Sequence, residues 1–212
     1  LDVLAAAGFR TERTFSHWLG KAFSGADVID VIFNSGNGFS LVDDEWFAHA
    51  VDDRILGVPV RLCPVEESIW SKAFIMERER YDGADVTHLL LASAERLDWN
   101  RLLRRFGPHW RPLFSHLVLF GFIYPGDRSR IPAWVMEELS CRLQREIAQA
   151  HRGEPVCCGT LLSRAQYLVD IERWGYRDAR LLPPGTMTEE EIAAWTAAIE
   201  NDQQGDAARG DR

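Results

Sequence analysis

The sequence contains very little lysine. Only two of its 24 basic residues are lysines, Lys21 and Lys72, and the others are arginines. Acidic residues number 32, so the net charge is −8, which argues against a dedicated duplex nucleic-acid binder because such a protein needs a basic surface. No Walker-type loop, GxGxxG loop or GxSxG motif is present. The sequence therefore does not support hydrolysis by a nucleophilic side chain.

Long apolar runs and zinc-type cysteine spacings are also lacking. The most apolar stretch, residues 113–124, is shorter than the ~20 residues of a transmembrane helix, so we expect a core helix there. The four cysteines show no CxxC spacing and no dense disulfide framework. The adjacent Cys157 and Cys158 could be redox active, but two buried or loop thiols explain them better. We expect a cytoplasmic protein without a membrane segment.

The remaining composition predicts a folded α+β protein. Hydrophobic residues make up 46% of the chain, which excludes a wholly disordered protein. Short β-prone segments come first and helical patterns follow, with Glu66 and Glu67 placed to complement the dipole of a helix that starts at Pro64. The expected strands and hairpin are 8–12, 16–23, 28–33 and 54–62, with a turn at 34–38. The expected helices are 1–7, a short one from Asp43 or Asp44 to His49, 64–76, 82–94, 98–106, 112–122, 132–152, 161–174 and 188–199, the last opened by a capping box at Thr188 and Glu191.

This pattern predicts a small mixed sheet followed by a mostly helical body. We expect an α/β head at residues 1–62, a helical body at 63–199 and a disordered tail at 200–212, where apolar residues are scarce.

Asp30 lies in the middle of an otherwise apolar strand, in the sequence DVIDVIF of residues 27–33. Alternation places Val28 and Ile32 on the same face as Asp30 and apolar residues on the other, so we expect both faces to be partly covered. An unpaired buried carboxylate costs several kcal/mol. Asp30 therefore needs a cation, a metal or hydrogen-bond donors, and pairing with an arginine or with backbone groups is the simplest explanation.

Lys72 has no acidic residue three or four positions away on its predicted helix, so it cannot form an intrahelical ion pair. We expect its ammonium group to reach water, a buried carboxylate or a phosphate. Asp82, Asp85 and His88 follow at a spacing of three residues, which is compatible with a metal site. A helix cap, a first-turn acid and an ordinary histidine explain them better, and we expect Asp85 to organise Lys72 or a nearby arginine.

Residues 27–33 and 58–90 resemble the nucleotidyltransferase-fold proteins related to AbiEii-type abortive-infection toxins and to minimal nucleotidyltransferases. In that family, a strand with an acidic residue is followed by a helix with a lysine and then by an Arg/Lys-Asp-x-x-Asp element. The resemblance covers about residues 1–95. The matching positions are Asp30 for the third acidic residue, Lys72 for the helical lysine, and Arg80, Asp82 and Asp85 for the last element.

The resemblance implies a sheet of the nucleotidyltransferase type, a nucleoside triphosphate (NTP) substrate with Mg²⁺, and transfer of a nucleoside monophosphate to a hydroxyl acceptor. RNA, proteins and small molecules are all used as acceptors by relatives. Asp30 would be a catalytic residue and a metal ligand, Lys72 a catalytic residue, and Lys72, Arg80 and Asp85 would bind the nucleotide. The Gly-Ser turn and DxD pair of the family are not in this sequence, so we expect them upstream of an N-terminally incomplete chain.

Two alternatives remain open at this point. The chain could be a catalytically inert relative that acts as a binding or regulatory module and meets a protein partner through its Trp-rich helices. It could also be an unrelated helical scaffold in which Asp30 and Lys72 form a buried pair. The enzymatic interpretation predicts that Asp30 lies on a central strand and faces the helix of Lys72.

Overall fold

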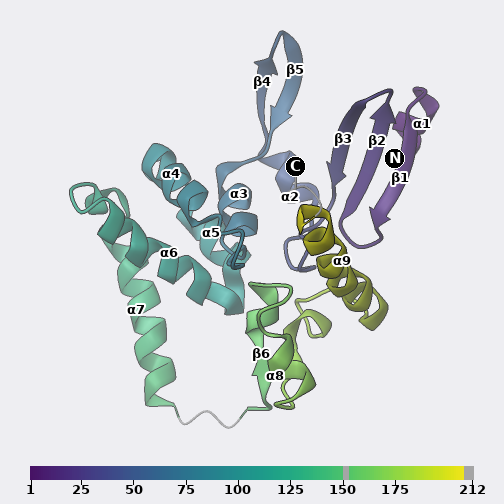
Figure 1. Ribbon diagram of the computed structural model, residues 1–212. Helices are drawn as coiled ribbons and strands as arrows, with labels where there is room; N and C mark the ends of the chain where they lie inside the picture. Colours follow the sequence, from purple (N-terminus) through teal and green to yellow (C-terminus); the bar gives the residue numbers. More distant parts are fainter. Residues whose placement is uncertain (150–152, 208–212) are drawn as a thin grey trace. The chain divides into compact units, whose positions relative to one another are not determined.

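The structure, a computed structural model, describes residues 1–149 and 153–207 (Figure 1). Its contacts divide the chain into two compact units. Leu1–Val42 and Pro155–Arg212 form the first, which we name the sheet unit, and Asp43–Glu154 forms the second, which we name the helical unit. The sheet unit is therefore discontinuous in sequence, and its boundaries differ from the expected division at residue 62.

A three-stranded antiparallel sheet forms the N-terminal part of the sheet unit. Helix α1 (Asp2–Ala6) precedes strands β1 (Arg10–Phe15), β2 (Leu19–Ser24) and β3 (Asp27–Ile32), which lie in the order β1-β2-β3. The helix ends before Gly8, whose φ of 93° is accessible mainly to glycine, as the sequence predicted. This sheet is antiparallel throughout, so the expected mixed sheet is not found among these strands.

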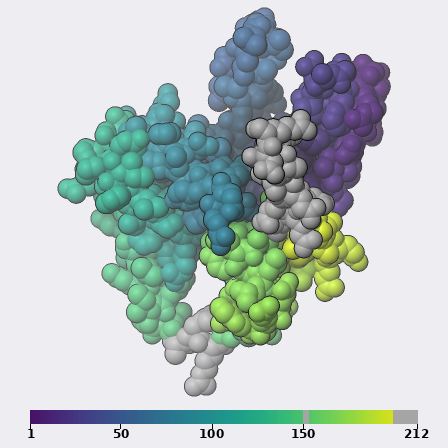
Figure 2. All heavy atoms as spheres, viewed as in Figure 1, coloured from purple at the N-terminus to yellow at the C-terminus, as the bar shows by residue number. Residues whose placement is uncertain are grey.

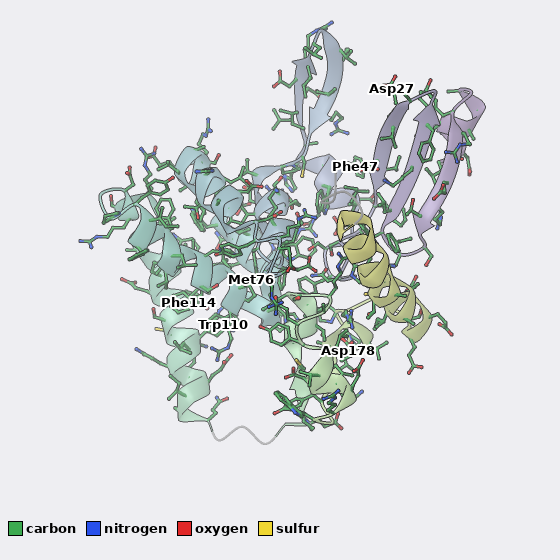
Figure 3. All side chains as sticks on the ribbon, viewed as in Figure 1. Asp27, Phe47, Met76, Trp110, Phe114 and Asp178 are labelled. Carbon is green, nitrogen blue, oxygen red and sulfur yellow. The ribbon has the colours of Figure 1, made fainter. Side chains whose placement is uncertain are left out.

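The C-terminal segment completes the sheet unit. It contains a two-residue parallel pair, β6 (Val156–Cys157) and β7 (Arg177–Asp178), and helices α8 (Leu168–Glu172) and α9 (Glu189–Ala207). Asp178, labelled in Figure 3, accepts hydrogen bonds from the fully buried guanidinium of Arg180. The distance between Arg180 Nη2 and Asp178 Oδ2 is 2.6 Å. The segment also holds the turn at residues 34–38, because the Asn37 amide donates to Leu161 O and the Thr186 hydroxyl donates to Gly38 O.

Helix α9 anchors the segment to the sheet through Trp195. Its indole packs edge-on against Phe15 and Trp18, with ring centroids 4.8 and 5.2 Å away. The predicted capping box is confirmed, since Glu191 N donates to Thr188 Oγ1 and Thr188 N donates to Glu191 Oε2. The helix extends to Ala207, beyond the expected end at residue 199, and residues 208–212 of the expected tail lie outside the described residues.

The helical unit packs around helices α3 (Val65–Lys72) and α6 (Trp110–Ile123). Helix α3 contacts α4 (Gly83–Ser93) and α5 (Trp99–Phe106), whereas α6 contacts α4, α5 and α7 (Ala133–Ala148). The core is built from one face of each helix, and its fully buried members include Ile69, Leu90, Leu102, Phe106, Leu113, Leu117 and Phe120. Among the described residues, no helix is both long enough and apolar enough to cross a membrane.

A hairpin of β4 (Val51–Ile55) and β5 (Val58–Leu62) extends from the helices of its unit, after the short helix α2 (Asp44–Ala48), and Figure 2 shows it as a separate protrusion. Its turn residues, Leu56 and Gly57, have φ values of 51° and 82°, as a tight two-residue hairpin turn requires. The predicted hairpin is thus confirmed, with both strands largely exposed.

Most helix starts follow the sequence. Asp98 caps α5 by accepting Arg101 N at 2.9 Å, and Asp43 caps α2 by accepting Glu45 N at 3.1 Å. The expected helix over 161–174 is wrong in its first half. Ser163 Oγ accepts the N–H groups of Ala165 and Gln166, which stabilises a turn, and only Leu168–Glu172 is α-helical.

The packing of Trp195 yields a prediction about the sheet unit. Trp195→Ala should destabilise the β1–β3 sheet by about 2 to 3 kcal/mol, below the full cost for a completely buried tryptophan, because the aromatic cluster loses its central ring. Hydrogen exchange of the β1–β3 amides in urea measures the loss. Trp174→Ala is the matched control, since Trp174 is 65% exposed, and it should change stability by less than about 0.5 kcal/mol. Equal effects of the two variants would contradict this anchoring role.

Candidate functional site

Asp30 does not occupy the central, covered position that the sequence predicted. Strand β3 lies at the edge of the sheet, and Val28 and Ile32, on the same face as Asp30, are 52% and 58% exposed. The Asp30 carboxylate lies 3.2 Å from Lys21 Nζ on the paired residue of β2, and half of its side chain is exposed. The expectation of a covered strand fails because side chains on both faces of β3 remain exposed, and β3 has only β2 as a strand neighbour among the described residues. Asp30 therefore belongs to an exposed cross-strand ion pair.

Three of the predicted site residues, Lys72, Arg80 and Asp85, meet in the helical unit together with Asp82. We name Lys72, Arg80, Asp82 and Asp85 the Lys72 cluster. Lys72 Nζ donates to Asp85 Oδ2 at 2.6 Å and to Asp82 Oδ2 at 3.2 Å, and Arg80 Nε lies 3.3 Å from Asp82 Oδ1. Of the two partners expected for Asp85, Lys72 or a nearby arginine, the structure shows Lys72. Lys72 and Asp30 lie in different units, and each has a different partner.

The electrostatics keep Lys72 positively charged. Partial burial acts to lower its pKa, but the hydrogen bonds to Asp85 and Asp82 outweigh this effect, and the pKa is raised above the ordinary value. The same hydrogen bond from Lys72 lowers the pKa of Asp85. Lys72 is therefore unsuited to act as a neutral nucleophile. An ammonium group has three donors, so with two on the carboxylates one is left, and the side chain is 34% exposed.

A short connection between α3 and α4 brings the cluster together. Met76, labelled in Figure 3, forms an antiparallel bridge with Tyr81, and Asp82 N donates to Ile75 O at 3.2 Å. These contacts return the chain to the C-terminal end of α3, where Lys72 lies. Gly83 at the start of α4 lets the Tyr81 ring lie close to the backbone, since a Cβ atom there would lie 2.1 Å from that ring.

His116, on helix α6, contacts this connection. Its Nε2 lies 3.2 Å from Ala73 O, the carbonyl that follows Lys72, and its ring stacks on Tyr81 at a centroid distance of 6.1 Å. A carbonyl only accepts, so Nε2 carries the proton and Nδ1 is unprotonated. Burial lowers the pKa of His116 and thus favours this neutral form. The side chain fixes the end of α3 without adding charge to the Lys72 cluster.

A buried ionic network holds the other end of α3. Arg101 Nη2 lies 2.5 Å from Glu66 Oε2, and its Nη1 lies 3.2 Å from Glu67 Oε2. Arg105 Nε donates to Glu67 at 3.1 Å, and both Arg105 terminal nitrogens bind Asp43. Glu67 is completely buried, and the other side chains except that of Asp43 are at most 10% exposed. The hydrogen bond from Arg105 lowers the pKa of Asp43, and the same bond raises that of Arg105.

The sequence did not identify His116, Tyr81 or this network as parts of the site's support. Glu66 and Glu67 look like ordinary first-turn helix acids, and their arginine partners come 34 or more residues later. The neighbouring Trp110 and Phe114 indicate only that His116 is a residue at the edge of the core. No local pattern reports which carbonyl a buried histidine will reach, so these contacts could be found only from the fold.

The metal alternative for Asp82, Asp85 and His88 finds no support in the geometry. Within residues 1–149 and 153–207, no group of three or more His, Cys, Asp or Glu side chains is arranged to hold a metal ion. Both aspartates of the trio are instead bound to Lys72. A cation would have to displace that ammonium group.

Comparisons of the chain with protein-family models, with curated proteins and with solved structures find no match. The chemistry of the site must therefore be argued from its own residues.

The buried network yields a stability prediction. Arg101→Met should cost about 3 to 5 kcal/mol in the unfolding of the helical unit, because it leaves Glu66 and part of Glu67 buried without a counter-charge. Urea unfolding at neutral pH measures this loss.

Arg142→Ala is the control for the loss of an arginine. Its ion pair with Glu138 is a partly exposed i,i+4 pair within one helix, so the expected cost is at most about 0.5 kcal/mol. If the two variants lose similar stability, the network does not anchor α3.

Proposed function

We propose that this chain is a nucleotidyltransferase-like protein that binds the phosphates of an NTP at Lys72. The observation that carries the proposal is the Lys72 cluster, since four positions named by the family resemblance meet at one place although they are up to 13 residues apart in sequence. A charged ammonium group with a spare donor and solvent access is a suitable phosphate ligand.

The proposed reaction transfers a nucleoside monophosphate to an acceptor hydroxyl in RNA, a protein or a small molecule. The acceptor oxygen forms a bond to the α-phosphorus, the bond between the α- and β-phosphates breaks, pyrophosphate leaves, and the hydroxyl proton is lost to solvent or a base. Lys72 would offset negative charge on the phosphates, and Arg80 would supply a second positive charge next to it. Asp82 and Asp85 would orient Lys72 and compete with the phosphates for it.

The described residues do not fit a resident Mg²⁺ ion. Asp30 is a single carboxylate that already has an ammonium partner, and Mg²⁺ needs further oxygen ligands. The proposal therefore treats magnesium as the counter-ion of the triphosphate substrate and derives no step from it. The role of Asp30 as a metal ligand and catalytic residue stays a prediction.

A second candidate function, an inert binding or regulatory module, is favoured by one observation. The outer face of α6 carries apolar side chains that the unit does not cover: Val118 and Ile123 are about half exposed, and Phe122 is 82% exposed. Nucleotide binding without any turnover by the protein would favour this function over the enzymatic one.

The nucleotide proposal predicts opposite effects for two substitutions in the same cluster. Lys72→Ala should weaken NTP binding by at least about 10-fold, because the phosphates lose their ligand. Asp85→Asn should instead strengthen binding by a few fold, because it removes a carboxylate that competes for Lys72, and its cost in stability should be small since Asp85 is exposed. Calorimetric titration with ATP, GTP, CTP and UTP, with and without Mg²⁺, measures both.

Arg96→Ala is the control for these titrations. It removes an exposed cation from the same unit, at a site where the guanidinium only binds Ala92 O, and it should leave binding unchanged. Absence of NTP binding by the unaltered protein would overturn the proposal. A purely structural ion pair would be indicated if both cluster variants lost stability and neither changed the binding of a nucleotide.

A further inference from the structure

A groove of about 1030 Å³ lies between α5 and α7 in the helical unit, away from the Lys72 cluster residues. Helix α5 lines it with Leu103, Arg104 and the adjoining Gly107, and α7 lines it with Trp134, Glu137 and Cys141. Residues 134, 137 and 141 follow the spacing of one helix face, so α7 presents a two-turn stripe to the groove. The groove is thus an open channel between two helices rather than a closed pocket.

Opposite charges without partners lie on the two walls. Arg104 and Glu137 are both exposed, and neither forms an ion pair or hydrogen bond with any residue that the structure describes. Their neighbours are different: Arg142 on α7 is paired with Glu138 at 2.7 Å, and Arg105 on α5 is held in the buried network. The groove therefore keeps one cation and one anion available for an occupant.

Apolar surface accompanies these charges. Trp134 is 44% exposed at the α7 wall, whereas Leu103 on α5 is nearly buried at 7%. A Cβ atom on Gly107 would meet no atom within 4 Å, so the backbone is open to the groove at this point. A partner surface that brings together a large apolar side chain, an acid and a base would satisfy both walls.

We propose that the occupant is α7 of a second copy of this chain. The α7 stripe carries the side chains that the groove requires, an exposed tryptophan and an unpaired glutamate, and the groove itself carries the arginine that would receive this glutamate. In a two-fold dimer each contact occurs twice, so Arg104 of each copy binds Glu137 of the other. Trp134 of each copy packs against the exposed Cys141 and the open backbone at Gly107 of the other.

The size of the groove sets the expected affinity of the dimer. It is lined by nine residues per copy, fewer than the roughly 20 to 30 residues per side of a standard interface. The dimer is therefore weak, with a dissociation constant in the micromolar range, and it forms by rigid docking of helices that already exist.

Sedimentation velocity over a protein concentration of about 1 to 200 μM tests the dimer. The unaltered protein should pass from monomer to dimer in this range. Arg104→Glu places two acids opposite each other in each half of the interface and Glu137→Arg places two bases there, so each variant alone should dimerise at least about 10-fold more weakly. Trp134→Ala should weaken the dimer as well.

Mixing the two charge variants is the decisive experiment. In a heterodimer of Arg104→Glu with Glu137→Arg, both reciprocal pairs join opposite charges, so the mixture should dimerise to within about 3-fold of the unaltered protein. This recovery cannot come from a folding effect, because neither chain is changed by mixing. A monomeric unaltered protein at all concentrations, or a mixture that stays monomeric, would overturn the proposal.

Phe122→Glu on the exposed face of α6 is the control for another interface. It should leave the dimer unchanged, and circular dichroism should show that all variants keep their helix content. If Phe122→Glu dissociates the dimer and the charge variants do not, α6 forms the interface and the α5–α7 proposal is wrong. The dimer does not depend on NTP binding, so either proposal can fail alone.

Discussion

The buried ionic network between α3 and α5 is the constraint on which the candidate site depends. Two adjacent acids at the start of α3, Glu66 and Glu67, are held by Arg101 and Arg105 from a helix more than 30 residues later. Buried ions are stable only when nearly all of their hydrogen-bonding groups are satisfied, so the network permits few relative positions of the two helices. Its main contribution is to fix geometry rather than to add net stability.

The opposite end of α3 is fixed by a neutral contact. His116 donates to Ala73 O and supports Tyr81, so the end of the helix and the following connection are held together. Lys72 lies between these two fixed points, yet its ammonium group remains partly exposed. Rigid backbone under a charged, accessible side chain is the arrangement that a phosphate-binding lysine needs, because less side-chain and backbone entropy is lost on binding.

Local chemistry was predictable from the sequence, and long-range pairing was not. The start of α5 at Asp98 and of α9 at Thr188 followed from capping residues. The lack of any acid at helical spacing indicated that Lys72 reaches a group outside its own helix, and the structure shows that this group is Asp85 together with Asp82. The exposed edge position of β3 did not follow, because an apolar strand looks the same in sequence whether or not a neighbour covers it. The return of the C-terminal segment to the sheet, through Trp195, also has no local signal.

A crystal structure of the protein with a non-hydrolysable NTP analogue and Mg²⁺ tests the central claim most directly. The account predicts a phosphate oxygen within hydrogen-bond distance of Lys72 Nζ, bound to the donor that Asp85 and Asp82 leave free. The positions of α3 and His116 should not change, since the site is already formed. A nucleotide bound elsewhere, with Lys72 still held by both aspartates, would contradict the account.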